Sequence, residues 1–120
     1  MNPKALTDYC LSKKGAEEDF PFGPDVLVIK VAGKMFALIS QRENKLCLSL
    51  KCDPFLAQDF RQRYPSITAG YHLSKKNWNT IEVDGSIPED ELHWMMDHSY
   101  ALVLKGLPKG VRESIEYDMY

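Results

Sequence analysis

The sequence predicts an α+β domain with two layers, in which a five-stranded antiparallel sheet packs against helices. Two observations predict this fold class. Segments that alternate apolar and polar residues are joined by turns of two or three residues, which is typical of antiparallel hairpins. Segments with apolar residues at helical spacing precede, interrupt and follow them. The resulting order is α-β-β-β-α-β-β-α, with helices segregated from an antiparallel sheet.

The N-terminal segment predicts a helix from about Pro3 to Lys14. Asn2 is a good N-cap, proline is favourable in the first turn, and Gly15 is a stop signal. The next ten residues, "AEEDFPFGPD", contain two prolines and a glycine. We therefore expect them to form a loop.

Three strands are expected next, at residues 26–33, 34–41 and 45–52, joined by turns at 33–34 and 42–44. The third strand alternates most clearly, which indicates that one of its faces belongs to the core. The two alternating sets are Leu46, Leu48 and Leu50, and Cys47, Ser49 and Lys51.

Two further helices are predicted. Asp53 as N-cap and proline at the next position begin a helix that runs to about Tyr64. Ser86 and Glu89 have the spacing of a capping box for a helix that ends near Leu104. On this last helix Trp94, His98 and Ala101 lie on a second face. We expect either the tail at residues 108–120 or another subunit to cover that face. Its core stripe is predicted as Leu92, Met95, Met96, Ser99, Tyr100 and Val103.

Composition indicates one ordinary domain spanning residues 1–120. The chain has 44% hydrophobic and 27% charged residues, and no apolar run approaches the length of a membrane span, so we expect a cytoplasmic protein without membrane contact. Cys10, Cys47 and Cys52 form no C-x-x-C pair and are interpreted as reduced, buried residues. Neither a metal site nor a cofactor is predicted. The net charge of −2 argues against a strongly positive nucleic-acid surface.

The stretch "GYHLSKKNWNTI" between the second and third helices concentrates the unusual residues. Ser74 is interpreted as the N-cap of one helical turn, formed by Lys75, Lys76, Asn77 and Trp78, with the following strand starting at about Asn79. Leu73 would then meet Trp78 as a hydrophobic staple.

Two interpretations of this turn remain open. Its free backbone N–H groups and two lysines could seat a phosphate, or the lysines could only keep a sheet edge soluble. Tyr71 and Trp78 could stack on bases, although aromatic residues on such a turn are more often core. His72 has no catalytic partner at a recognisable spacing and is interpreted as structural.

Several segments resemble, in order and spacing, the YjbR/MmcQ family of small bacterial proteins. The segments are "EDFPFGPDVLVIKVAGKMFALI", "LSLKCDP", "YPSITAGYHLSKKNWNTI" and "HSYALVLKGLP". The resemblance implies a fold related to the CyaY/frataxin proteins and the type III secretion chaperones. It also implies DNA binding through hairpin wings, to which Lys34, Lys75 and Lys76 would contribute.

Known catalytic motifs, including the nucleophile elbow, phosphate-binding glycine loop and dinucleotide fingerprint, do not occur, so we expect a non-enzymatic protein. Two alternatives to DNA binding stay open. One is a protein-interaction module or homodimer that uses "DFPFGP" and the face of Trp94 and His98. The other is a small anionic ligand at the turn from Ser74 to Trp78.

Overall fold

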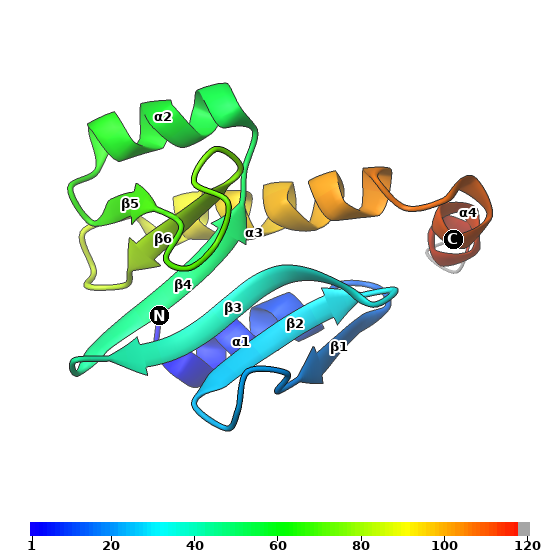
Figure 1. The fold of residues 1–120 in the computed structure, drawn as a ribbon, viewed down its shortest axis with the longest axis horizontal. Coiled ribbons are helices and arrows are strands. Elements are labelled where there is room, and N and C mark those ends of the chain that lie inside the picture. The colour runs from blue at the N-terminus through cyan, green and yellow to red at the C-terminus, as the bar shows by residue number, and fades with distance from the viewer. Residues whose placement is uncertain (118–120) are drawn as a thin grey trace.

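A computed structural model describes residues 1–117 as helices packed on one large sheet (Figure 1). The predicted α+β class and two-layer arrangement are confirmed. The elements in chain order are α1 (Pro3–Leu11), β1 (Ala16–Asp19), β2 (Val26–Val31), β3 (Lys34–Arg42), β4 (Lys45–Lys51), α2 (Pro54–Arg63), β5 (Ile67–Ala69), β6 (Trp78–Glu82), α3 (Glu89–Lys105) and α4 (Lys109–Tyr117).

The sheet has six antiparallel strands in the order β1-β2-β3-β4-β6-β5, one strand more than predicted. The additional strand is β1, which lies in the segment expected to be a loop and pairs Ala16 with Val31 and Asp19 with Val28. Its four residues are mostly exposed, so they carry no apolar alternation for a pattern to detect. The prolines and the glycine that suggested a loop all follow Asp19.

The hydrophobic core lies between the sheet and the helices, and α1 and α3 lie behind the sheet in Figure 1. On β4, Leu48 and Leu50 pair with Ile39 and Ala37 of β3, and all four side chains are buried on the helix side. The α3 core stripe is confirmed in full, because the helix buries Leu92, Met95, Met96, Ser99, Tyr100 and Val103.

A β-bulge in β3 attaches α3 to the sheet. Pairing with β2 shifts so that Phe36 is an extra residue, and both Phe36 and Ala37 are fully buried. The Ser99 hydroxyl of α3 donates a hydrogen bond to the Phe36 carbonyl (2.5 Å) and accepts one from the Lys51 backbone N–H (2.9 Å). One buried hydroxyl therefore satisfies two backbone groups that the bulge would otherwise leave unpaired.

Of the N-caps predicted for the three helices, two are confirmed and one is wrong. The side chain of Asn2 accepts from the Ala5 N–H, and that of Asp53 accepts from two N–H groups at the start of α2. Ser86 does not cap α3, because Pro88 is still extended and occupies the N-cap position. Ser86 instead donates its backbone N–H and its hydroxyl to Asp84. The first helix also ends earlier than expected, at Leu11 rather than Lys14.

The tail forms α4, which lies beyond the C-terminal end of α3 (Figure 1). Ile115 packs against the edge of the core, close to Gly15. This position leaves the Trp94 side chain 49% exposed, so residues 108–117 do not cover this part of the second face of α3. The alternative, that another subunit covers it, stays a prediction. Residues 118–120 of the predicted tail lie outside the described residues.

Candidate ligand-binding site on the open face of the sheet

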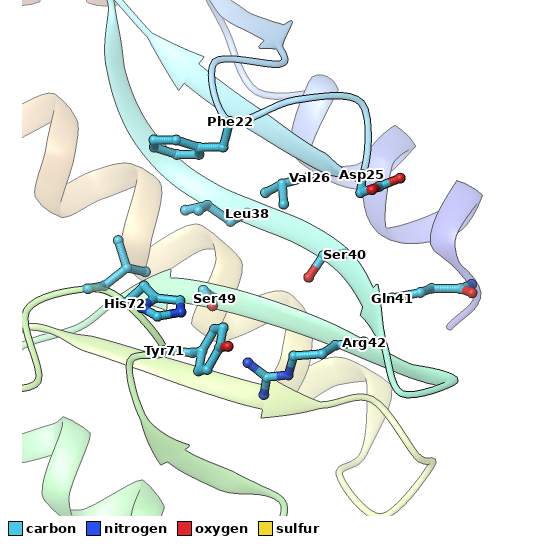
Figure 2. Close-up of a pocket in the computed structure, with 11 residues that line it drawn as sticks. Phe22, Asp25, Val26, Leu38, Ser40, Gln41, Arg42, Ser49, Tyr71 and His72 are labelled. Atoms are coloured by element: carbon cyan, nitrogen blue, oxygen red, sulfur yellow. The ribbon is translucent and has the colours of Figure 1, made fainter.

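The face of the sheet opposite the core is built by the alternate residues of the same strands. Strand pairing aligns Val28, Leu38, Ser49 and Thr80 in one row across β2, β3, β4 and β6. We call this surface the open face. Two loops lie beside it, the 20–25 loop before β2 and the 70–77 loop before β6 (Figure 2).

A cavity of about 420 Å³ lies between these loops on the open face (Figure 2). Its apolar lining consists of Phe22, Val26, Leu38, Tyr71 and Leu73. Its polar lining consists of Asp25, Ser40, Gln41, Arg42, Ser49 and His72. A concave, largely apolar site with a few polar groups is the usual form of a ligand pocket.

Tyr71 is the centre of a cluster on one wall of the cavity. The Arg42 guanidinium lies 3.6 Å from the centre of the Tyr71 ring, and the ring centres of Tyr71 and His72 are 4.0 Å apart. The Tyr71 backbone N–H donates to the Thr80 hydroxyl (2.9 Å), which is also bonded to Ser49 (2.9 Å). The cluster is therefore fixed to the sheet, while the Tyr71 side chain stays 52% exposed.

The 70–77 loop reaches this position through one close approach and one unusual backbone angle. A Cβ atom on Gly70 would stand 2.8 Å from Cβ of Trp78 and 3.1 Å from Cβ of Leu73, so only glycine fits there. His72 has a φ of +58°, which is uncommon for a residue other than glycine. Such strained residues often occur at ligand sites.

The predicted turn from Ser74 to Trp78 is held in place by hydrogen bonds to other parts of the chain. The Trp78 N–H donates to the Ser74 carbonyl (3.0 Å), which closes one helical turn as predicted. Arg61 of α2 donates to the Lys75 carbonyl and, through Nε, to the Asn79 side chain (2.6 Å). The Asn77 carbonyl accepts from the Cys52 N–H (2.7 Å). The turn is thus held from both α2 and the end of β4.

The predicted site residues separate into three groups. Tyr71 and His72 line the cavity. Ser74, Lys75 and Lys76 are exposed, and Asn77 is half-buried, on the turn outside the cavity. Trp78 begins β6, one residue earlier than expected, and is only 9% exposed, so it is a buried residue outside the cavity lining.

Lys34 lies apart from these residues. It is the first residue of β3 and lies beyond the last paired residues of β3 and β4. The same end of β4 pairs with Trp78. Lys34 and the basic turn are therefore at the same end of the sheet, with β4 between them. Strand pairing brings them into one region but does not make them one cluster.

Sequence reasoning missed Arg42 and Phe22 as lining residues. Arg42 shares the open face with Leu38 and Ser40, so strand alternation could have placed it there. Phe22 belongs to the "FPFG" segment and is 58% exposed, and its position over the sheet depends on how the 20–25 loop folds back. No spacing rule predicts that loop path.

The cysteines play no part in this site. All three are free and buried, which confirms their interpretation as small core residues. Burial raises the pKa of the Cys10 thiol to about 12 and that of the Cys52 thiol to about 11, so both are poor nucleophiles at neutral pH. Among residues 1–117, no cluster of three or more histidine, cysteine or acidic side chains could hold a metal ion, and no helix is long and apolar enough to cross a membrane.

Comparison with known proteins identifies relatives along most of the chain. The YjbR family model matches residues 11–102. The chain is 34% identical over 113 residues to "Uncharacterized protein YjbR" of Escherichia coli K12, covering 94% of this chain and 96% of that protein. It is 39% identical over 90 residues to "Uncharacterized protein YbdF" of Escherichia coli O157:H7, covering 75% of this chain and 74% of that protein.

Solved structures agree with this relationship. A crystal structure of a Deinococcus radiodurans protein with a DUF419 domain superposes with a TM-score of 0.88 at 37% identity, covering 96% of this chain and 91% of that one. A crystal structure of a Pseudomonas syringae protein superposes with a TM-score of 0.75 at 26% identity, covering 85% and 98%. The sheet, the loops around the cavity and most of α3 all fall within the matched residues. The chain belongs to the YjbR family.

Proposed function

We propose that this chain is a non-enzymatic DNA-binding protein of the YjbR type and that the open face of the sheet is its contact surface. The observation that carries the proposal is the exposed Tyr71 ring stacked with Arg42 at 3.6 Å on this face. Sheet surfaces that present aromatic rings and arginine planes hold unstacked bases in many nucleic-acid-binding modules. This chemistry favours single-stranded or locally opened DNA over an intact duplex.

The distribution of charge supports a contact of moderate strength. Lys75 and Lys76 are exposed beside the cavity, and Lys51 lies on the open face at the same end of the sheet. The acidic residues at the start of α3 belong to the helix layer. Because the whole chain carries a net charge of −2, we expect micromolar rather than nanomolar affinity and a steep dependence on salt.

Two features support a role without catalysis. The hydroxyl groups of Ser49 and Thr80 under the cavity bond to each other (2.9 Å) rather than to a histidine or carboxylate that could act as a base. The buried thiols of Cys10 and Cys52 have raised pKa values, which does not suit a nucleophile. Three free cysteines are also consistent with a reducing compartment, so a cytoplasmic location stays our prediction.

The test is a fluorescence anisotropy titration of the full chain with labelled single-stranded and duplex DNA at low ionic strength. We expect the single strand to bind more tightly than the duplex. The double variant Lys75→Ala/Lys76→Ala should weaken binding and lower the slope of log affinity against log salt by about 1.4, since each phosphate contact on single strands contributes about 0.7.

The matched control is Lys4→Ala/Lys109→Ala, which removes two exposed lysines from α1 and α4 and should leave the slope unchanged. Absence of binding in the micromolar range to either form of DNA would overturn the proposal. Inorganic phosphate in the same assay tests the alternative of a small anion at the turn from Ser74 to Trp78.

A second candidate function, self-association or binding of another protein, is favoured by one observation on the helix layer. Phe55 is 86% exposed on α2, and Trp94 is 49% exposed on α3 beside the buried Phe60 ring (centres 6.0 Å apart). A groove of about 430 Å³ between α2 and α3 includes Phe60 and Trp94. Exposed apolar patches of this kind often mark protein contacts.

Sedimentation velocity over a wide concentration range tests this candidate. A dimer through the groove would be lost in the double variant Phe55→Ser/Trp94→Ser, whereas Phe22→Ser on the open face would leave it intact. A strict monomer at high concentration, together with no partner retained by the immobilised chain, would rule the candidate out.

A further inference from the structure

The cavity on the open face is more enclosed than a flat surface on which bases could stack. Its volume of about 420 Å³ lies in the range of pockets that bury small ligands. Phe22 forms one wall, and Tyr71 with His72 lies across from it (Figure 2). Leu38 contributes to an apolar floor between them. Two aromatic walls above an apolar floor suit a flat, ring-shaped group.

Arg42 supplies a charge that no carboxylate of the described residues neutralises. Within residues 1–117 its guanidinium makes no ion pair with a carboxylate, and its contact is the face of the Tyr71 ring. By contrast, Arg63 pairs with two carboxylates and Lys30 pairs with Asp19. A planar cation fixed at the edge of an apolar cavity is well suited to bind a phosphate.

The Ser40 hydroxyl can bind the edge of a base. It points into the cavity and can serve as a donor or an acceptor, whereas the Asp25 and Gln41 side chains point away from it (Figure 2). Nucleobases present alternating donors and acceptors along their edges, in the plane of a flat ring. The cavity thus provides separate partners for the ring faces, for the ring edge and for an attached phosphate.

We propose that this cavity binds a single nucleotide, with the base between Phe22 and the Tyr71–His72 wall and the phosphate against Arg42. The inference deepens the proposed function, because it assigns one base of a bound DNA strand to an enclosed pocket rather than to the sheet surface. The same chemistry fits a free nucleotide, so the experiment must separate the two sources.

The experiment uses the ¹⁵N-labelled full chain and records amide chemical shifts during titration. The probes are the four deoxynucleoside monophosphates, deoxyribose 5-phosphate, and a single-stranded oligonucleotide with or without one abasic position. Expected shifts concentrate at residues 22–26, 40–42 and 71–73, and they are weaker with deoxyribose 5-phosphate, which lacks the base.

Three variants test the assigned roles. Phe22→Ala should weaken binding of the base-containing probes about tenfold, the effect of losing one stacking partner. Arg42→Lys keeps the charge but loses the planar group, and it should weaken the deoxynucleoside monophosphates and deoxyribose 5-phosphate alike, since both carry the phosphate. Phe55→Ala, which removes an even more exposed ring from α2, is the matched control and should change nothing. Circular dichroism confirms that each variant is folded.

The outcomes separate this inference from the proposed function. If monophosphates shift the cavity residues but oligonucleotides do not bind, the pocket takes free nucleotides and the DNA-binding proposal fails. If oligonucleotides bind and Phe22→Ala weakens them, both stand. If oligonucleotides bind with shifts elsewhere and unchanged affinity in Phe22→Ala, the pocket inference is overturned and DNA binding stands. If neither class of probe binds, both are overturned.

Discussion

The two faces of the sheet use alternate residues of the same strands for different purposes. On the helix side, Ile39 and Leu48 pair across β3 and β4 and are at most 5% exposed. On the open side, the neighbouring Leu38 pairs with Ser49 and lines a cavity. One strand therefore carries core residues and cavity residues one position apart. Substitutions should separate in the same way, with stability lost on one face and binding lost on the other.

The largest effect is expected from a pair of phenylalanines. Phe36→Ala removes a fully buried ring that packs edge-on against Tyr100 (centres 5.3 Å apart), and it should lower the free energy of unfolding by about 3–5 kcal/mol. Phe22→Ala on the open side should change it by no more than about 0.5 kcal/mol. Urea denaturation monitored by circular dichroism measures both. Similar losses in the two variants would break the distinction between the faces.

A smaller effect is expected from a pair of serines. Ser99→Ala removes the hydroxyl that bonds the Phe36 carbonyl and the Lys51 N–H, which leaves two buried backbone groups without partners. At about 1–2 kcal/mol for each unsatisfied group, the lower part of the usual range, the loss should reach about 2–4 kcal/mol. Ser40→Ala on the open side is the control and should be nearly neutral. Unchanged urea midpoints for Ser99→Ala would show that water replaces the hydroxyl.

The helix side was largely predictable from the sequence, because burial against helices imposes a period. The spacing of apolar residues identified every buried position of the α3 stripe, and residue chemistry identified the caps at Asn2 and Asp53. The errors lie where no burial pattern exists. Strand β1 forms through backbone hydrogen bonds at an exposed edge, and Pro88 shifts the start of α3 away from the Ser86 spacing.

The open side was predictable only in part. The sequence indicated Tyr71 and His72 because they lie in a stretch that concentrates unusual residues. It indicated the turn from Ser74 to Trp78 because of its capping pattern. The cavity itself depends on two loops that meet only in the folded chain, one carrying Phe22 and the other Tyr71. The role of Arg61 in holding the Lys75 carbonyl is equally non-local. Local periodicity contains no information about such contacts.

Gly70→Ala should affect both stability and binding. Gly70 lies against the buried Trp78 and directly precedes Tyr71 in the cavity wall. Its added Cβ would stand 2.8 Å from Cβ of Trp78, which has no flexible end that could move aside. We expect a loss of about 1–3 kcal/mol in unfolding free energy, typical of overpacking. The displaced loop should also weaken oligonucleotide binding. Retained wild-type affinity in a destabilised variant would show that the position of Tyr71 does not matter for binding.

The smallest expected effect concerns His98, at the outer side of the helix layer. Its Nε2 accepts the Asp53 backbone N–H (3.2 Å), and burial lowers the pKa of the imidazole, although the Asp53 carboxylate acts in the opposite direction. The folded state therefore binds protons less readily than the unfolded chain, whose histidine titrates near pH 6.5. The stability that the neutral His98 contributes is complete above the pKa of the unfolded chain. It is lost as the pH falls below that pKa toward the lower pKa of the folded state.

Urea denaturation at about pH 7 and about pH 5 should show this loss in the wild-type chain, since these values bracket the ordinary histidine pKa. His98→Gln retains an acceptor for the Asp53 N–H but cannot gain a proton, so its loss of stability over the same interval should be smaller. The effect is modest because His98 is only half-buried. Equal losses in the two proteins would mean that acid sensitivity arises elsewhere.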